Sequence, residues 1–204
     1  MTSLYKMSES KTSLFRLLVI TPEEAYPQET QWVNRLFNSG LQSLHLRKPG
    51  WSELQLLCYL EQIEACYHPQ IMLHHGAGVP EQLRVKGLHF QQHTLPQVKS
   101  GYCVSCSVHS WQEYLAVEEQ VTYAFISPFF NSISKQGYRA NPELQVMPAE
   151  ANAQKAVALG GVNSSRIEEV RHLGLGGAAL LGAIWQSVNP LAAFLEIQKK
   201  LYHG

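Results

Sequence analysis

Two glycine-rich segments in the last third of the chain have residue types suited to binding a phosphate. One reads Lys155-Ala-Val-Ala-Leu-Gly160-Gly161, and the other reads Gly176-Gly177-Ala-Ala-Leu-Leu-Gly182-Ala-Ile-Trp185. In each, an apolar run typical of a buried strand ends in glycine. A phosphate can approach a glycine backbone closely and bind its N–H groups. The pair predicts a phosphate site, although glycines at these positions could also serve only tight strand–helix turns.

Histidines follow several of the other apolar runs. Histidine can transfer protons near neutral pH without a large pKa shift. Any one of these side chains could instead be a hydrogen-bonded structural residue. Because six of the nine histidines fall at predicted strand ends, the set favours a functional site there. These six are His45, His74, His75, His89, His93 and His109.

Two cations near these ends are suited to binding an anion. Arg47 has a planar guanidinium that can hold a carboxylate or phosphate through two hydrogen bonds. Its alternative role is an internal ion pair. Lys135 lies in the Ser-rich loop between Phe129 and Asn141, where a mobile anion clamp would be useful. Its alternative role is a solvated surface lysine.

We predict no metal site. Barrel hydrolases usually add a carboxylate to their histidines, and the chain contains no aspartate, since all 16 acidic residues are glutamates. Cys103 and Cys106 form a C-x-x-C pattern within one predicted strand. Residues three apart in a strand point to opposite faces, so we interpret both as structural thiols.

The elements that must position these residues alternate between strand and helix throughout. This order predicts parallel α/β architecture. The predicted strands span 15–21, 43–47, 70–74, 87–90, 102–108, 122–127, 156–160 and 178–182. The predicted helices span 28–39, 52–65, 79–85, 110–119, 164–173 and 190–201, and the helices after strands four and six are short or missing. Ser52 and Ser110 are predicted helix N-caps, the latter within a capping box with Glu113.

Eight strands predict a single (β/α)8 TIM barrel over residues 13–204, preceded by an N-terminal extension over residues 1–12. The alternative is a doubly wound open sheet. The first predicted strand lacks a following G-x-G-x-x-G, and the phosphate signals follow the last two strands. Both observations favour the barrel.

Bulk composition excludes several classes of function. The chain has 204 residues, 45% of them hydrophobic, and a formal net charge of zero. We therefore expect no nucleic-acid or membrane partner. The polar N-terminal segment lacks the apolar core of a signal peptide, so we expect a cytoplasmic protein. Trp32, Trp111 and Tyr114 on predicted helices could pack against the barrel, which we prefer, or form a homodimer interface.

Six motifs together resemble the thiamine phosphate synthase superfamily over roughly residues 15 to 200. They are Leu44-His-Leu-Arg47, Gly87-Leu-His-Phe90, Ser107-Val-His-Ser110, Pro128-Phe-Phe-Asn-Ser-Ile-Ser-Lys135, Ala158-Leu-Gly-Gly161 and Gly177-Ala-Ala-Leu-Leu-Gly-Ala-Ile184. The resemblance implies a (β/α)8 barrel that binds a phosphorylated thiazole. The superfamily contains the synthase and a branch of thiazole tautomerases.

The synthase reading implies coupling of hydroxymethylpyrimidine diphosphate to thiazole phosphate with the help of Mg²⁺. The chain departs from the synthase pattern of Gln-x-Arg-x-Lys on strand two, Asn-Asp-Arg after strand three and an aspartate after strand four. It has His45 in place of the glutamine, His74-His75-Gly76 after strand three, and His93 in place of the aspartate. Histidine is a poor ligand for Mg²⁺.

The tautomerase branch resembles the chain better and implies no cofactor. In that resemblance His109 is the catalytic base, and Arg47 or Lys135 holds the substrate carboxylate. Backbone N–H groups of Gly160, Gly161, Gly182 and Ala183 would hold the phosphate. The other expected substrate-binding residues are His45, His89, Ser132 and Ser134. The synthase and a non-catalytic phosphate-binding barrel remain the alternatives.

Overall fold

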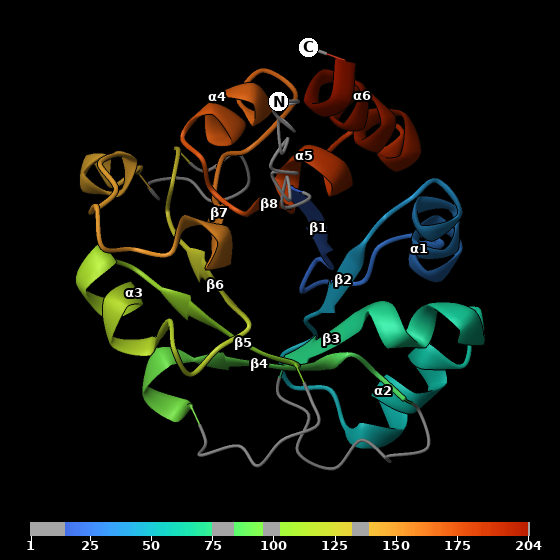
Figure 1. Cartoon of the computed structure of the whole chain (residues 1–204). Helices are drawn as coiled ribbons and strands as arrows, with labels where there is room; N and C mark the ends of the chain where they lie inside the picture. The colour runs from blue at the N-terminus through green and yellow to red at the C-terminus, as the bar shows by residue number, and fades with distance from the viewer. Residues whose placement is uncertain (1–14, 75–83, 96–102, 132–138, 204) are drawn as a thin grey trace, which may run out of the picture.

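Eight parallel strands close into one barrel in the computed structural model, which describes residues 15–74, 84–95, 103–131 and 139–203. The strands follow one another around the ring in chain order, and β8 pairs with β1 (Figure 1). This closure confirms the predicted TIM barrel and excludes the open sheet. The strands are β1 (Arg16–Ile20), β2 (Ser43–Leu46), β3 (Ile71–His74), β4 (Gly87–Gln91), β5 (Cys103–Val108), β6 (Tyr123–Ile126), β7 (Ala156–Leu159) and β8 (Gly177–Leu180).

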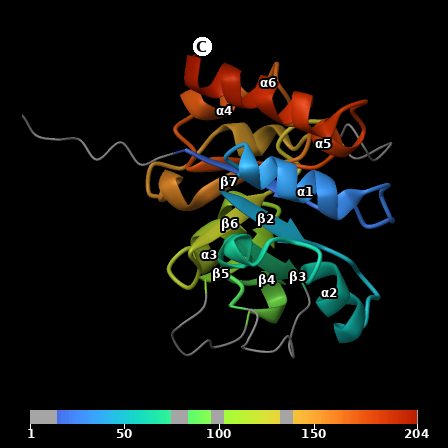
Figure 2. The ribbon, with the colours of Figure 1, turned by 90° about the vertical axis from the view of Figure 1, so that its right-hand side faces the viewer.

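Helices surround the ring of strands, and Figure 2 shows α1 and α6 against the outside of the barrel. Short 3₁₀ segments precede β3 and β7 and follow β4 and β6. The helices are α1 (Glu29–Asn38), α2 (Glu53–Leu60), α3 (Trp111–Val117), α4 (Ile167–His172), α5 (Gly182–Trp185) and α6 (Pro190–His203). The 3₁₀ segments are η1 (Ala65–Gln70), η3 (Gln92–Thr94), η4 (Pro142–Gln145) and η5 (Ala153–Lys155).

Side chains alternate along each strand between two cores, as the period of two residues requires. On β1, Leu17 and Val19 face the helices and join the large outer core. Leu18 and Ile20 face the barrel axis, where Tyr123 and other strand residues complete a smaller inner core. Because both faces of each strand are buried, the strands read as continuous apolar runs, and this pattern made them predictable.

The observed bounds of all eight strands lie within two residues of the predictions. The predicted helix 52–65 ends at Leu60 and gives way to η1, and the last predicted strand ends at Leu180 because Gly182 opens α5. Ser52 forms a complete capping box with Gln55. The capping box predicted at Ser110 is only half correct. Ser110 caps α3, whereas the Glu113 carboxylate accepts from the N–H of His109.

Two aromatic residues of α3 pack inside the chain. The Trp111 indole N–H donates to the Leu144 carbonyl at 3.1 Å, and the Tyr114 hydroxyl donates to the Asn152 carbonyl at 2.6 Å. Both side chains are buried, whereas Trp32 is half-buried beside Arg35. These contacts support packing over a dimer interface for Trp111 and Tyr114. In the described parts of the chain, no helix has the length and apolarity needed to span a bilayer.

The glycine pair after β7 is required by the close approach of the loop after β6. Gly160 and Gly161 have φ angles of +102° and +68°. The N–H groups of Phe129 and Phe130 donate to the carbonyls of Leu159 and Gly160. A Cβ on Gly161 would lie 2.3 Å from the Asn131 carbonyl oxygen. These glycines therefore position the pocket wall whether or not they bind a phosphate.

Gly161→Ala should destabilise the fold more than Gly174→Ala. Gly174 also has a positive φ, +78°, but its added Cβ would meet no atom within 4 Å. We expect backbone strain alone to lower the free energy of unfolding by about 1–2 kcal/mol in Gly174→Ala. Strain plus the clash should lower it by about 3 kcal/mol or more in Gly161→Ala. Urea unfolding of both variants measures the difference, and equal losses would contradict the close-approach argument.

Candidate active site

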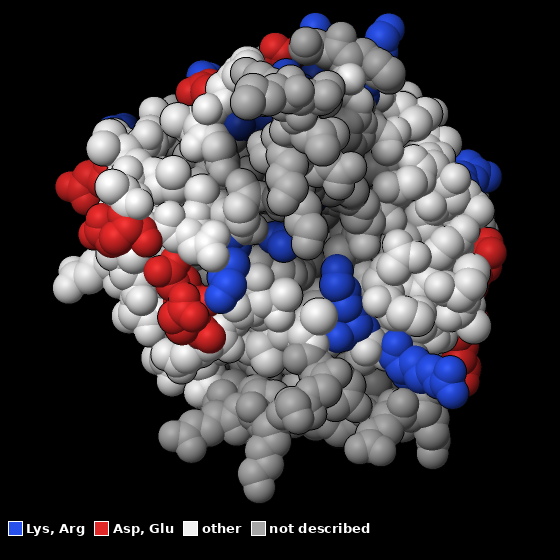
Figure 3. All heavy atoms as spheres, viewed as in Figure 1, with Lys and Arg blue, Asp and Glu red and all other residues white. Residues whose placement is uncertain are grey.

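One pocket opens where the carboxyl ends of all eight strands meet. Its volume of about 200 Å³ suits one small molecule rather than a polymer. On the opposite face of the barrel, where the strands begin, the basic side chains of the described residues lie in separate groups (Figure 3). The pocket is lined by Ile20, Glu23, Arg47, His74, Gln91, Ser107, His109, Phe125, Ser127, Leu159, Gly160, Gly161, Val162, Ala179, Leu181, Gly182 and Ala183.

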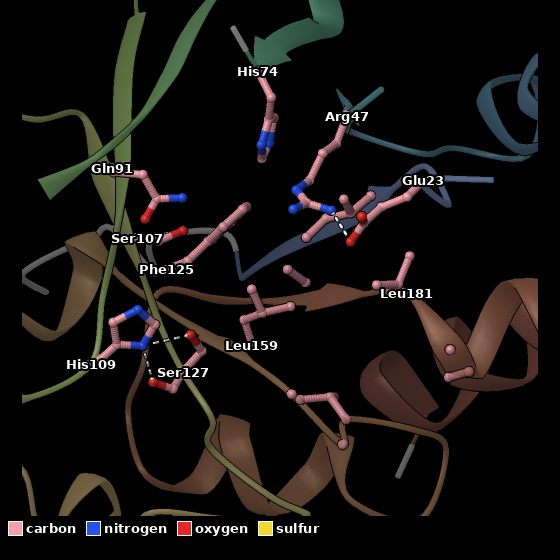
Figure 4. A pocket seen from close by; sticks show the side chains of 17 residues that line it. Glu23, Arg47, His74, Gln91, Ser107, His109, Phe125, Ser127, Leu159 and Leu181 are labelled. Atoms are coloured by element: carbon pink, nitrogen blue, oxygen red, sulfur yellow. Dashed lines mark hydrogen bonds and ion pairs between the residues drawn. The ribbon is translucent and has the colours of Figure 1, made fainter. Parts of the chain in front are cut away.

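His109 follows β5 and is oriented by hydrogen bonds on two sides. Its Nδ1 lies 2.8 Å from the Ser127 carbonyl oxygen and 3.4 Å from the Ser127 hydroxyl. Because a carbonyl oxygen can only accept, Nδ1 carries the proton and donates it. The Nε2 atom therefore has the lone pair of the neutral ring and points away from Ser127 (Figure 4). The Glu113 carboxylate holds the backbone N–H of His109 at 2.6 Å.

Arg47 and Glu23 form an ion pair at the opposite wall (Figure 4). Their side chains are 33% and 40% exposed, so water screens the attraction only in part. Thr21 fixes the Arg47 backbone, since its hydroxyl accepts from the Arg47 N–H at 2.9 Å and donates to the Arg47 carbonyl at 3.2 Å. The sequence analysis gave an internal ion pair as the alternative role of Arg47. The structure contains this ion pair, and both of its side chains line the pocket.

Lys48 connects the loops that follow β1 and β2. Its ammonium is fully buried and donates to the Glu29 carboxylate at 2.8 Å. It also donates to the carbonyls of Pro22 at 2.7 Å and Glu24 at 3.2 Å, on either side of Glu23. The Tyr59 hydroxyl donates to the other Glu29 oxygen at 2.8 Å, and burial together with Glu29 raises the pKa of Tyr59. Lys48 is therefore a structural cation and does not line the pocket.

A chain of buried polar side chains lies beneath the pocket. His74 lines the pocket, and its Nε2 is hydrogen-bonded to His45 Nδ1 at 3.0 Å. His45 Nε2 is hydrogen-bonded to the Tyr123 hydroxyl at 2.6 Å. Burial, followed by the charges of His74, His89 and Lys86, lowers the pKa of His45 well below its usual value. Burial likewise raises the pKa of Tyr123. Both groups are therefore neutral at pH 7.

A second branch of this network contains His89. Its two ring nitrogens are hydrogen-bonded to the hydroxyls of Ser105 at 2.8 Å and Ser107 at 2.9 Å. Among the described residues, every buried side-chain nitrogen and oxygen has a hydrogen-bond partner. The network therefore satisfies the imidazoles without leaving a desolvated polar atom.

The three buried histidines are also the one candidate metal-binding group among the described residues. One ligand atom from each of His45, His74 and His89 lies within 4.8 Å of the others. A tetrahedral Zn²⁺ at about 2.1 Å from each nitrogen would need these atoms roughly 3.4 Å apart. The rings of His74 and His89 are stacked, with centroids 4.1 Å apart, so their in-plane lone pairs do not converge. We therefore interpret the cluster as a hydrogen-bond network.

The glycine loops form the wall beside β7 and β8. Gly160, Gly161, Gly182 and Ala183 all line the pocket. Gly182 and Ala183 open α5, so their backbone N–H groups have no partner within that helix. This wall offers backbone donors suited to a phosphate, facing the side chains of His109 and Arg47.

The structure brings together part of the site predicted from the sequence. His109, Arg47 and the four loop residues line one pocket, whereas His45 and His89 lie buried beneath it. Their observed contacts support the pocket residues from below, and contact of either imidazole with a substrate stays a prediction. His93 is exposed and outside the pocket lining, so the six histidines do not share one rim. Ser132, Ser134, Lys135, His75 and most of the predicted helix 79–85 lie outside the described residues.

Two important residues were missed by the sequence reasoning. Glu23 follows β1, but only the polar residues after strands two to six were considered. Its position two residues after Thr21, at a strand end, was a usable signal. Tyr123 begins β6, where an aromatic residue resembles ordinary core. Its hydroxyl partner, His45, is distant in sequence, so no local pattern indicates the hydrogen bond.

A closed (β/α)8 barrel with a polar pocket at the carboxyl ends of its strands is the arrangement of a TIM-barrel enzyme. Residues 17–184 match the thiamine monophosphate synthase family. The chain belongs to this family, whose members act in thiamine biosynthesis. This confirms the family resemblance; the match does not distinguish the tautomerase branch.

Two curated relatives are named thiamine-phosphate synthase. The protein from Latilactobacillus sakei is 27% identical over 133 residues, and the alignment covers 60% of this chain and 59% of the relative. The chain thus spans less than two thirds of that relative. The protein from Leuconostoc citreum is 24% identical over 196 residues, covering 87% of this chain and 92% of the relative.

Solved structures give the same family and fold. A thiamine phosphate pyrophosphorylase from Bacteroides thetaiotaomicron superposes with a TM-score of 0.76 and 27% identity, covering 91% of this chain and 97% of that one. A thiamine phosphate pyrophosphorylase from Pyrococcus furiosus has a TM-score of 0.73 at 17% identity. The superposition covers 93% of this chain and 96% of that one. The latter supports the fold alone.

Lys48→Met should destabilise the protein by about 3 kcal/mol, because it leaves the buried Glu29 carboxylate without its cation. Arg166→Met removes the exposed Arg166–Glu169 pair, whose side chains are 51% and 41% exposed. We expect that control to lose less than about 1 kcal/mol. Chemical denaturation measures both, and similar losses would show that Lys48 is no more important than a surface pair.

Stability should fall as the solution becomes acidic, in part because of His45. Its pKa is lowered in the folded state, so below pH 6.5 the unfolded chain binds a proton that the folded chain rejects. His45 makes its full contribution to the free energy of unfolding above pH 6.5. This contribution is lost as the pH falls toward the folded-state pKa of His45, at up to about 1.4 kcal/mol per pH unit. Unfolding free energies between pH 5 and 7.5 should show a shallower slope in His45→Gln. His172 is exposed, so His172→Gln should keep the wild-type slope of unfolding free energy against pH. The same slope in the wild type and both variants would contradict the contribution of His45.

Proposed function

We propose that the chain is a thiazole tautomerase that acts on a carboxylated thiazole phosphate without a metal ion. The observation that carries this proposal is the orientation of His109. Its Nδ1 donates to the Ser127 carbonyl, so Nε2 is the unprotonated atom of the neutral ring. A base of this kind, at a pocket wall, is the group that a proton shift between two atoms of one substrate requires.

The proposed reaction moves one proton. His109 Nε2 removes it from a ring carbon of the non-aromatic thiazole, and the C–H electron pair enters the conjugated system. The resulting imidazolium returns the proton from Nε2 to a second carbon, which leaves an aromatic ring and neutral His109. The Ser127 carbonyl accepts from Nδ1–H throughout, so it stabilises the imidazolium and keeps the ring oriented.

The remaining pocket residues bind the two ends of this substrate in the proposal. Backbone N–H groups of Gly160, Gly161, Gly182 and Ala183 hold the phosphate. Arg47 lies on another wall, and its guanidinium has five N–H donors, so besides its ion pair with Glu23 it can also hold the carboxylate. Negative charge that develops on the carboxylated ring is then stabilised by the guanidinium.

The synthase is the second candidate, and the names of the relatives favour it. The Mg²⁺ implied by that reading prefers oxygen ligands, carboxylates above all. Among the described residues that line the pocket, Glu23 is the one carboxylate, and it is ion-paired with Arg47. These residues do not fit a magnesium site, which supports the tautomerase. A homodimer and a cytoplasmic location remain predictions from the sequence.

His109→Asn should lower kcat for aromatisation of the carboxylated thiazole phosphate by about 10²- to 10⁴-fold, the usual contribution of a general base. Asparagine retains a donor for the Ser127 carbonyl but cannot accept the substrate proton. The ultraviolet absorbance of the aromatic product, followed with a chelator present, gives the rate.

His93→Asn is the matched control, because His93 is exposed and does not line the pocket. We expect it to retain wild-type kcat. Wild-type turnover in His109→Asn would remove His109 from its proposed role, and the same loss in both variants would point to a nonspecific effect.

A further inference from the structure

The backbone of His109 is held by side chains from two other parts of the chain. His109 is the first residue after β5 and is exposed, so close packing contributes little to its position. Its N–H donates to the Glu113 carboxylate at 2.6 Å, and its carbonyl accepts from the Asn141 side chain at 3.4 Å. The shorter bond has a charged acceptor, which makes it the stronger kind of hydrogen bond. Glu113 is therefore the main contact that holds this backbone.

Glu113 is itself fixed within the first turn of α3. The Ser110 hydroxyl accepts from the Glu113 N–H at 3.1 Å. In an ordinary capping box, the glutamate side chain would accept in return from the N–H of Ser110. Here it accepts from the N–H of the preceding residue, His109. The helix is in turn held by its buried Trp111 and Tyr114 side chains, so the two bonds join His109 to a fixed element.

The position of this backbone determines where the imidazole points. His109 Nδ1 reaches the Ser127 carbonyl, at the end of β6, with a distance of 2.8 Å. Moving the His109 backbone would lengthen this bond, release the ring and displace Nε2. A misplacement of about 1 Å in a reacting group can lower a rate by about 10²-fold.

The groups proposed to bind the substrate lie on other elements. Arg47 follows β2, and the glycine loops follow β7 and β8. Because these groups do not depend on Glu113, a displaced His109 should lower kcat and leave KM nearly unchanged.

We propose that Glu113 is a positioning residue, which orients the base His109 by accepting a hydrogen bond from its backbone N–H. The required property is an acceptor atom in this place, and the negative charge is not needed. This inference rests on the proposed function for the reaction that His109 performs. The orientation of the imidazole can also be measured without turnover.

The kinetic test compares Glu113→Ala, Glu113→Gln and Glu118→Ala in the aromatisation assay. Glu118 is the matched control: it is the C-cap of α3, and its carboxylate accepts from the backbone N–H of Asn152 at 2.9 Å. It is not among the residues that line the pocket. We expect Glu113→Ala to lower kcat by about 10- to 10²-fold, with KM changed by less than about threefold. Glu113→Gln retains an acceptor oxygen and should stay within about threefold of wild-type kcat, as should Glu118→Ala.

The second readout is proton–nitrogen correlation NMR of the His109 imidazole in its neutral form, assigned by the signals that His109→Asn removes. The wild type, Glu113→Gln and Glu118→Ala should each show one tautomer, with the proton on Nδ1. Glu113→Ala should show a mixture of the two tautomers, because its ring is no longer held against the Ser127 carbonyl.

Four results would overturn the proposal. They are wild-type kcat in Glu113→Ala, equal losses in Glu113→Ala and Glu118→Ala, a loss in Glu113→Gln as large as that in Glu113→Ala, and a single Nδ1–H tautomer in Glu113→Ala. Equal losses in the two alanine variants would indicate general destabilisation, and the failure of Glu113→Gln would indicate a role for charge. A wild type that does not aromatise the thiazole would refute the proposed function, whereas the tautomers would still decide the role of Glu113.

Discussion

Pairing of β8 with β1 is the constraint on which the rest of the structure depends. It closes the sheet, so the carboxyl ends of strands far apart in the sequence meet in one ring. Arg16 to Val19 pair in register with Gly177 to Leu180, which places the loop that contains Glu23 beside the wall that contains Gly182 and Ala183. Without this closure, the proposed phosphate loops and the Arg47–Glu23 pair would lie at opposite edges of an open sheet.

Polar groups inside the barrel are arranged so that the pocket contains little uncompensated charge. Burial keeps His45 neutral, and the hydrogen bonds of Tyr123, Ser105 and Ser107 satisfy the imidazoles that replace apolar core residues. Arg47 is balanced by Glu23, and Lys48 by Glu29. An unbalanced buried charge would destabilise the fold strongly. At the pocket wall, His109 donates from Nδ1 to the Ser127 carbonyl, which leaves Nε2 as the atom proposed to accept the substrate proton.

Much of the fold and part of the site could be predicted from the sequence, for identifiable physical reasons. Strands buried on both faces produce apolar runs, so their ends, and hence the positions of Arg47, His109 and the glycine loops, followed directly. How far each side chain lies below the pocket depends on the register of the strands, which cannot be read from the sequence. His45 pairs with Met72, whereas His74 lies two residues further along β3 and reaches the pocket. His89 lies below Gln91 and Ser107, which pair with each other and line the pocket.

The capping role assigned to Glu113 was wrong in part, because its carboxylate binds the N–H of His109.

The most direct test of the central claim is a paired turnover assay on the purified protein. One reaction contains the non-aromatic carboxylated thiazole phosphate and a chelator. The other contains hydroxymethylpyrimidine diphosphate and the aromatic thiazole phosphate, with and without Mg²⁺. The account predicts aromatisation in chelator and no coupling in either condition. Magnesium-dependent coupling without aromatisation would contradict it and make the chain a synthase.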